Sequence, residues 1–358
     1  MNRRLGWRSK HPILVIESDD WGAEHIPGPE ISKNLPENYL PGHSHSNLDG
    51  LERPEDIDKL CDALNLHKDK FGNAAVLTAN FVMTNPDFSA IRENEFSLYV
   101  AKSISYGWNH EQDTEGMWKC YRRAIKDNLF VPQLHGERHF CPSKWLHRLR
   151  QKDWAALRAF ECLMVGGEED ESGIGLQSMS PIYHAEENAI QRLVADGAET
   201  FRNVFGKNSF TTIAPCYGWR SPETEKALLK QQIRAMQGRE YQHLPGGRMR
   251  VHYLGQRDKT GMIYLTRNCH LEPIPKGTSV RRCMREIEQA FGQGLPAVVC
   301  SHRINFTSRV AASVRDKGLA QLNAVLSEVT KRFPDVEFLS SEQLASRIMA
   351  ENCNPLTS

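Results

Sequence analysis

The chain has 358 residues, and its 45 Lys and Arg nearly balance its 44 Asp and Glu, which leaves a formal net charge of +1. The apolar residues make up 40% of the chain, which is typical of a globular protein and excludes the disordered and collagen-like classes. The near-neutral charge argues against a nucleic-acid partner. No apolar run approaches the roughly 20 residues of a membrane helix, so we expect no membrane span.

Nine cysteines are scattered along the chain without any Cys-x-x-Cys pair. An odd number without such a pair favours free thiols in a reducing compartment over a disulfide framework. The N-terminus is basic, but the apolar segment of a secretory signal does not follow it. The sequence therefore predicts a cytoplasmic protein.

Short β-branched runs alternate with helical patterns along the whole chain. In chain order, we predict a strand at 12–17, a helix at 55–69, a strand at 74–82, a helix at 114–127, a strand at 129–134, helices at 143–163 and 185–205, a strand at 210–214, a helix at 222–231, a strand at 233–236, β-structure with a turn at 248–272, a helix at 278–292, a strand at 296–301, a helix at 310–332, a strand at 336–339 and a helix at 341–349.

This alternation indicates parallel β-α units, and their number favours a distorted (β/α) barrel, which we expect to be seven-stranded. An open doubly wound sheet is the alternative, but no Gly-x-Gly-x-x-Gly motif follows the first strand. Residues 1–358 are interpreted as a single domain with two long loops, at 22–56 and 166–183, because neither loop separates segments of different composition.

In such a barrel, functional residues lie at the carboxyl ends of the strands. The first predicted strand runs into Asp19 and Asp20, whose side chains should point to different sides of the chain. One carboxylate can then bind a metal while the other acts as a base. A solvated turn is the structural alternative for this pair.

Two further strand ends carry histidines. His135 and His139 follow one strand at a spacing that places both rings on one face of a helical turn, where both can reach one ion. Glu137 occupies the middle position, so the metalloprotease motif His-Glu-x-x-His is absent. His302 ends a later strand and can serve as a general acid. Together these ends predict a two-His, one-carboxylate metal site suited to hydrolysing an amide or ester.

In their order and spacing these motifs resemble the polysaccharide deacetylase family, that is, carbohydrate esterase family 4 with the NodB homology domain. The resemblance covers roughly residues 10–345. It rests on Ser18-Asp19-Asp20-Trp21-Gly22, His135-Gly136-Glu137-Arg138-His139, Val299-Cys300-Ser301-His302 and the second strand, 75–82.

The resemblance implies a role for each matching residue. Asp20, His135 and His139 would hold a divalent metal, Zn²⁺ first, with Co²⁺ or Ni²⁺ as alternatives. Asp19 would be the general base and His302 the general acid. The reaction implied is removal of an N- or O-acetyl group from a carbohydrate.

Two motifs of the family are altered here. The family's third motif, Arg-Pro-Pro-Tyr-Gly, appears as Ala214-Pro215-Cys216-Tyr217-Gly218, so Ala214 stands where an Arg should orient the base. We predict that Arg220 takes this role, and that the backbone N–H near Tyr217 helps to stabilise the oxyanion. The fourth motif, which supports the acid histidine, has no clear match, and Glu240 and Glu272 are the candidates.

Four residues are predicted to bind substrate: Trp21, Tyr217, Arg303 and Asn305. Capping of the barrel is the alternative for the aromatic ones. Two other functions stay open, namely a metal-dependent amidase acting on a non-sugar C–N bond and a non-catalytic carbohydrate-binding protein, which the missing Arg favours. Because the chain is predicted to be cytoplasmic, we expect a small or lipid-linked sugar as substrate rather than a cell-wall polymer.

Overall fold

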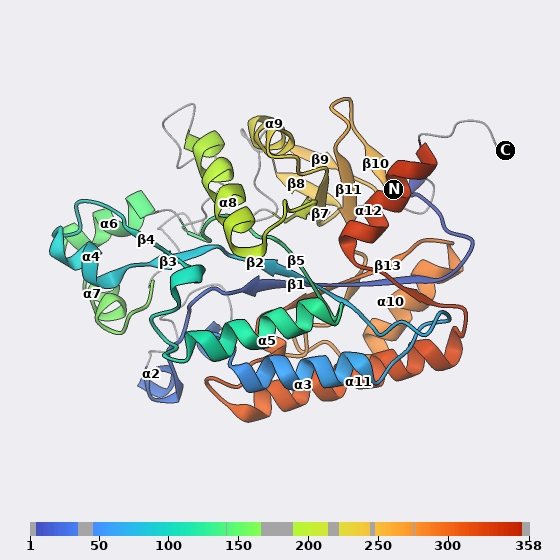
Figure 1. Cartoon of the computed structure of the whole chain (residues 1–358), viewed down its shortest axis with the longest axis horizontal. Helices are drawn as coiled ribbons and strands as arrows, with labels where there is room; N and C mark the ends of the chain where they lie inside the picture. Colours follow the sequence, from blue (N-terminus) through green and yellow to red (C-terminus); the bar gives the residue numbers. More distant parts are fainter. Residues whose placement is uncertain are drawn as a thin grey trace.

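A computed structural model describes residues 5–34, 46–140, 142–165, 189–213, 222–243, 248–274 and 276–352. Its centre is one curved sheet in the strand order β10-β11-β7-β6-β5-β2-β1-β13-β12, with β14 paired to β1 (Figure 1). The strands of this sheet are β1 (Ile13–Trp21), β2 (Leu77–Phe81), β5 (Phe130–Leu134), β6 (Thr211–Thr212), β7 (Ala235–Gly238), β10 (Gln256–Arg257), β11 (Ile263–Thr266), β12 (Cys269–His270), β13 (Ala297–His302) and β14 (Glu337–Phe338).

Helices and two small hairpins surround this sheet. The hairpins are β3 (Thr84–Pro86) with β4 (Ala101–Ser103), and β8 (Tyr241–His243) with β9 (Met249–Val251). The helices are α2 (Pro29–Asn34), α3 (Pro54–Asn65), α4 (Phe88–Glu93), α5 (Thr114–Lys126), α6 (Pro142–Arg150), α7 (Trp154–Glu161), α8 (Ala189–Phe205), α9 (Pro222–Lys230), α10 (Val280–Gly292), α11 (Ala312–Arg332) and α12 (Ser341–Asn352), with 3₁₀ turns η1 (Ser46–Leu48), η2 (Ile104–Tyr106) and η5 (Arg303–Phe306).

A connection of only two residues crosses from one side of the sheet to the other. Arg267 and Asn268 alone separate β11, which pairs with β7, from β12, which pairs with β13. The Arg267 N–H donates to the carbonyl of Gly238 on β7, whereas the Asn268 N–H donates to the carbonyl of Val298 on β13. The covalent chain thus links the two sides of the sheet, while no pairing between β11 and β12 is found among the described residues. The predicted (β/α) barrel is confirmed. The count of seven strands is not confirmed.

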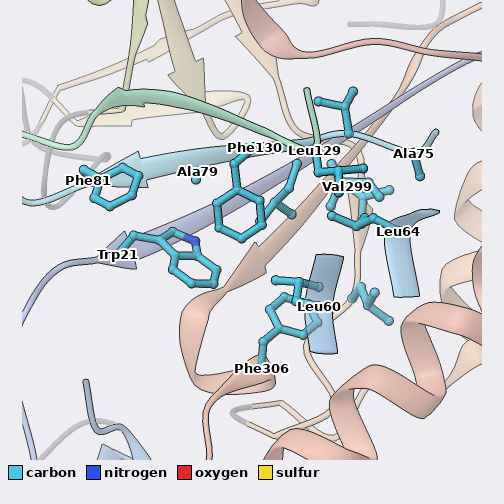
Figure 2. Packing of buried hydrophobic residues seen from close by; sticks show 14 of the residues in the cluster. Trp21, Leu60, Leu64, Ala75, Ala79, Phe81, Leu129, Phe130, Val299 and Phe306 are labelled. Carbon is cyan, nitrogen blue, oxygen red and sulfur yellow. The ribbon is translucent and has the colours of Figure 1, made fainter. Parts of the chain in front are cut away.

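The strands of the barrel pair in parallel, except for β10, which is antiparallel to β11. Every residue of β1 is buried, as expected for a parallel strand that is covered on both faces. Outside the barrel, α3, α5, α10 and α11 pack side by side (Figure 1). The main core lies between these helices and the sheet. There Trp21 packs edge to face against Phe130, with 5.1 Å between the ring centroids (Figure 2).

The predicted helix at 143–163 is wrong, because the structure has two helices there. Lys152 adopts φ 56°, and the Asp153 side chain then accepts a hydrogen bond from the N–H of Ala156 as the N-cap of α7. A local cap of this kind outweighs the apolar spacing that suggested one continuous helix. Trp154, the first residue of α7, is 67% exposed and does not contribute to the core.

Part of the predicted loop at 22–56 contains α2 and η1. Its residues 35–45, and the whole of the predicted loop at 166–183, lie outside the described residues. Among the described helices, none combines the length and the apolar character needed to cross a membrane.

The close approach of α11 to η5 yields a first prediction. A Cβ added at Gly318 would lie 1.6 Å from the carbonyl oxygen of Asn305, a backbone atom that cannot yield easily. We expect Gly318→Ala to lower the free energy of unfolding by about 1–3 kcal/mol or more, the cost of overpacking. Urea unfolding followed by circular dichroism measures this change. Gly292→Ala on α10 is the matched control, because nothing lies within 4 Å of its added Cβ. Equal stability of the two variants would contradict the prediction.

Candidate active site

A β-bulge ends β1 and separates the two adjacent carboxylates. Ser18 pairs with Ala79 and Trp21 with Phe81, so β1 has one residue more than β2 over this stretch. Asp20 takes up the extra residue with φ 73°, a left-handed conformation that is uncommon for a residue other than glycine. Backbone strain of this kind persists where the surroundings impose it, and it is frequent at functional sites.

Asp20 faces two histidines. Its Oδ1 lies 3.2 Å from His135 Nε2 and 3.6 Å from His139 Nε2. Residues 135–139 form a loop that turns at Gly136, with φ 84°, and not the helical turn considered from the spacing. The two rings still converge, with 5.5 Å between their centroids. The structure therefore brings the three predicted metal ligands together.

The donor set of this cluster fits a divalent ion. Single ligand atoms of Asp20, His135 and His139 all lie within 4.8 Å of one another. His135 Nδ1 donates to the carbonyl of Ile213 at 2.9 Å, so Nε2 is the nitrogen that faces Asp20 and could ligate an ion. Burial opposes the charge on Asp20, but the hydrogen bond from His135 and the charge of His139 hold the pKa of this carboxyl well below its usual range. Two imidazoles and an ionised carboxylate form a common zinc ligand set.

Asp19 is held by an arginine that the sequence motifs did not indicate. Arg267 donates from Nη1 to Oδ2 and from Nη2 to Oδ1 of Asp19, both at 2.7 Å, and from Nε to Glu17 at 2.6 Å. Burial would raise the pKa of Asp19, but Arg267 lowers it to about 2. Arg267 thus makes the contact with Asp19, the predicted base, that was expected of Arg220.

A buried amide network supports this pair. Asn80 Nδ2 donates at 2.7 Å both to Asp19 Oδ1 and to Gln237 Oε1. Gln237 Nε2 donates in turn to Asn80 Oδ1 at 3.0 Å and to Thr211 Oγ1 at 2.8 Å. Asn80, Gln237 and Thr211 are fully buried, so their polar atoms can bond only to protein partners. The network fixes the orientation of the Asp19 carboxylate.

His302 lies on the other side of Asp19 and has its own carboxylate partner. Its Nδ1 bonds to Glu272 Oε1 at 2.5 Å, and its Nε2 lies 3.8 Å from Asp19 Oδ2. Burial would lower the pKa of His302, but Glu272, Asp19 and Asp20 raise it to about 9. Glu272, one of the two candidates from the sequence, is therefore the group that supports the predicted acid.

Three predicted substrate-binding residues are buried, which corrects that assignment. Trp21 is fully buried, and its Nε1 donates to Ser18 Oγ. Arg303 is fully buried and bonds to Asp49 and Glu52. Asn305, also fully buried, donates from Nδ2 to Glu272 Oε2 at 2.9 Å. Trp21 packs in the core, Arg303 holds Asp49 and Glu52 in place, and Asn305 orients Glu272.

The remaining predicted residues are not described. Arg220 and Tyr217, with Ala214, lie outside the described residues, so their roles stay predictions. Arg267 is one of four arginines within the predicted β-structure at 248–272, so its presence there gave no signal of its own. No motif of the family marks that position.

Comparison with solved structures supports the fold. A protein from Parabacteroides distasonis described as a glycoside hydrolase/deacetylase superposes with a TM-score of 0.52 at 10% identity, over 97% of this chain and 73% of that one. The resemblance to the polysaccharide deacetylase family is confirmed at the level of the fold.

Two further structures are similar to this chain. A protein from Mycobacterium smegmatis described as a polysaccharide deacetylase has a TM-score of 0.46 at 14% identity, over 99% of this chain and 96% of that one. The peptidoglycan deacetylase PdaC from Bacillus subtilis has a TM-score of 0.42 at 9% identity, over 96% of this chain and 95% of that one. The sequence itself matches no protein-family model and no curated protein.

The guanidinium of Arg267, which bonds to both Glu17 and Asp19, gives a second prediction. Arg267→Met leaves the carboxylates of Glu17 and Asp19 buried without their cation, and we expect it to lower the free energy of unfolding by about 3–5 kcal/mol. Denaturant unfolding measures the loss. Arg332→Met is the control, because its ion pairs with Glu288 and Glu328 are exposed and should contribute little.

A rescue variant keeps this prediction testable if Arg267→Met does not fold. Replacing both carboxylates as well, by Glu17→Gln and Asp19→Asn, removes the buried charges and should recover much of the lost stability. A triple variant no more stable than Arg267→Met would show that the guanidinium does not act through these carboxylates.

Proposed function

We propose that the protein is a metal-dependent deacetylase that hydrolyses an N- or O-acetyl group of a carbohydrate. The observation that carries the proposal is the placement of two groups in opposite protonation states beside the Asp20–His135–His139 cluster. Asp19 is held ionised by Arg267, and His302 is held protonated by Glu272. Such a pair supplies the base and the acid for opening an amide or ester.

Asp20, His135 and His139 are the proposed ligands of the metal, and zinc is the ion we propose. A divalent ion there would supply Lewis-acid chemistry, polarising the acetyl carbonyl and acidifying water. Asp19 accepts a proton from the attacking water. Its low pKa makes it a weak base, so its contribution depends on orientation, which the bonds from Arg267 and Asn80 enforce.

His302 donates the proton that the leaving nitrogen or oxygen requires. Because its pKa of about 9 keeps it protonated at neutral pH, the acid is ready before the bond breaks. Glu272 fixes the ring through Nδ1 and leaves Nε2 directed toward Asp19 and the proposed reaction centre. Asn305 completes the arrangement by bonding to the second oxygen of Glu272.

The non-catalytic alternative rested on the missing arginine of the third motif. Arg267 makes the contact expected of that residue, which favours catalysis over binding alone. The amidase alternative shares every residue named so far and differs only in substrate. The reducing compartment and the small or lipid-linked sugar substrate stay proposals that rest on the sequence.

Acetate release tests the proposed function. With Zn²⁺ or Co²⁺ added, we expect the protein to release acetate from one or more N- or O-acetylated saccharides. Asp19→Asn should lower this rate by about 10²–10⁴-fold, the usual contribution of a general base, while metal binding persists. His135→Ala should lose metal affinity and activity together, as equilibrium dialysis will show. Acetate release by Asp19→Asn at the wild-type rate would refute its role, and release only from N-acetylated non-sugars would favour the amidase.

The pH profile tests the acid. His302 has a raised pKa, so its proton is present below about pH 9 and is lost as the pH rises through that value. Glu272→Gln removes the carboxylate that raises this pKa, so the alkaline limb of the kcat/KM profile should move to lower pH. Glu286→Gln is the control, because its carboxylate pairs with His270 instead. A limb that stays in place in Glu272→Gln would contradict the assignment.

A further inference from the structure

A cysteine lies beside the proposed acid pair. Cys300 stands two residues before His302 on β13, so both side chains project from the same face of the strand. Its Sγ lies 3.6 Å from Glu272 Oε1 and 3.4 Å from Arg267 Nη1. One ligand atom from each of Glu272, Cys300 and His302 lies within 4.8 Å of the others, so these residues form a second group with the spacing of a metal site, in which Glu272 and Cys300 are buried and His302 is partly exposed.

We infer that Glu272, Cys300 and His302 form a second site for a thiophilic divalent cation such as Zn²⁺, and that an ion bound there inhibits the enzyme. This site is separate from the Asp20–His135–His139 cluster. Its inhibitory effect rests on the proposed function, because it acts through the acid His302. The binding of the ion does not rest on it.

The geometry suits a tetrahedral ion. With Zn–S near 2.3 Å and Zn–O near 2.1 Å, a sulfur and an oxygen ligand lie about 3.6 Å apart. Cys300 Sγ and Glu272 Oε1 already have this separation. The Nδ1 of His302 must move away from Glu272 Oε1 by roughly 1 Å, since two such ligands of zinc lie about 3.3 Å apart. The ion then takes the place of the proton that these two groups share.

The local charge favours a cation. Glu17, Asp19 and Glu272 contribute three buried carboxyl groups, and the cations beside them are Arg267 and the imidazolium of His302. The imidazolium gives up its charge when an ion binds, which leaves Arg267 as the remaining cation. Burial raises the pKa of the Cys300 thiol to about 12, and the contact from Arg267 Nη1 to its sulfur offsets part of this rise. The side chain of His302 is 24% exposed, so an ion can approach from the His302 side.

Binding of the ion removes the acid. Two protons leave for solvent, one from the Cys300 thiol and one from the imidazolium of His302, and no oxidation is involved. His302 would then ligate through Nδ1 and no longer be held protonated by Glu272, so its Nε2 would donate poorly to a leaving group. Excess zinc would thus inhibit an enzyme that needs one equivalent for activity.

Cobalt titration of the full chain tests this site directly. We expect wild-type protein to bind a second equivalent of Co²⁺ and to show thiolate-to-cobalt charge transfer in the near ultraviolet. Cys300→Ser should lose this band and weaken the second equivalent at least tenfold while keeping the first. Cys283→Ser on α10 is the matched control, because that thiol is also buried, with its pKa likewise raised to about 12, and belongs to neither ligand group. Its spectrum should match wild type.

Each failure can be assigned to one hypothesis. A charge-transfer band that persists in Cys300→Ser, or the absence of a second equivalent in wild type, overturns the second site. Loss of the first equivalent of Co²⁺ in His135→Ala tests only the metal site of the proposed function, the Asp20–His135–His139 cluster. For each protein, acetate release is measured with one equivalent of Zn²⁺ and with excess Zn²⁺. The inhibition by excess Zn²⁺ should be at least tenfold weaker in Cys300→Ser than in wild type. Equal inhibition in both proteins would overturn the regulatory part of the inference.

Discussion

The site depends on one guanidinium at the closure of the barrel. Arg267 follows β11 directly, at the two-residue crossing where the ends of the sheet meet, and it reaches Glu17 and Asp19 on β1. Without this cation, two buried carboxylates would be left uncompensated, at a cost of about 3–5 kcal/mol. The residue whose backbone lies at this crossing therefore also fixes, through its side chain, the charge and orientation of the proposed base.

The sequence could place the proposed metal ligands and the proposed acid close together because the motifs that carry them end parallel strands. Such ends converge at one edge of a barrel, so Asp20, His135 and His139 could be placed together without knowing any loop. Arg267 could not be placed in this way. Its partner is set by how the sheet closes, and this closure joins residues about 250 positions apart, as the contact with Asp19 shows. A pattern read along the chain carries no signal for it.

The error at Trp21 has a definite cause. Along β1, Leu14 and Ile16 face the helices, whereas Ile13 and Val15 lie in a separate cluster on the opposite face. Strict alternation would therefore place Trp21 with the inward-facing Asp19. The bulge at Asp20 adds one residue and shifts Trp21 into the helix-facing core, against Phe130 (Figure 2). The same bulge that separates the two carboxylates removes the tryptophan from the substrate side.

The electrostatics of the site favour a catalyst over a binding module. Asp19 and His302 lie 3.8 Å apart, yet their pKa values, about 2 and about 9, diverge because each has a buried partner of opposite charge. Burying these groups is costly, and a sugar-binding surface needs neither a fixed carboxylate nor a stable imidazolium at that depth. Hydrolysis needs both, since one group must accept a proton and the other must donate one in a single turnover. Arg267 and Glu272 keep the pair in these opposite states.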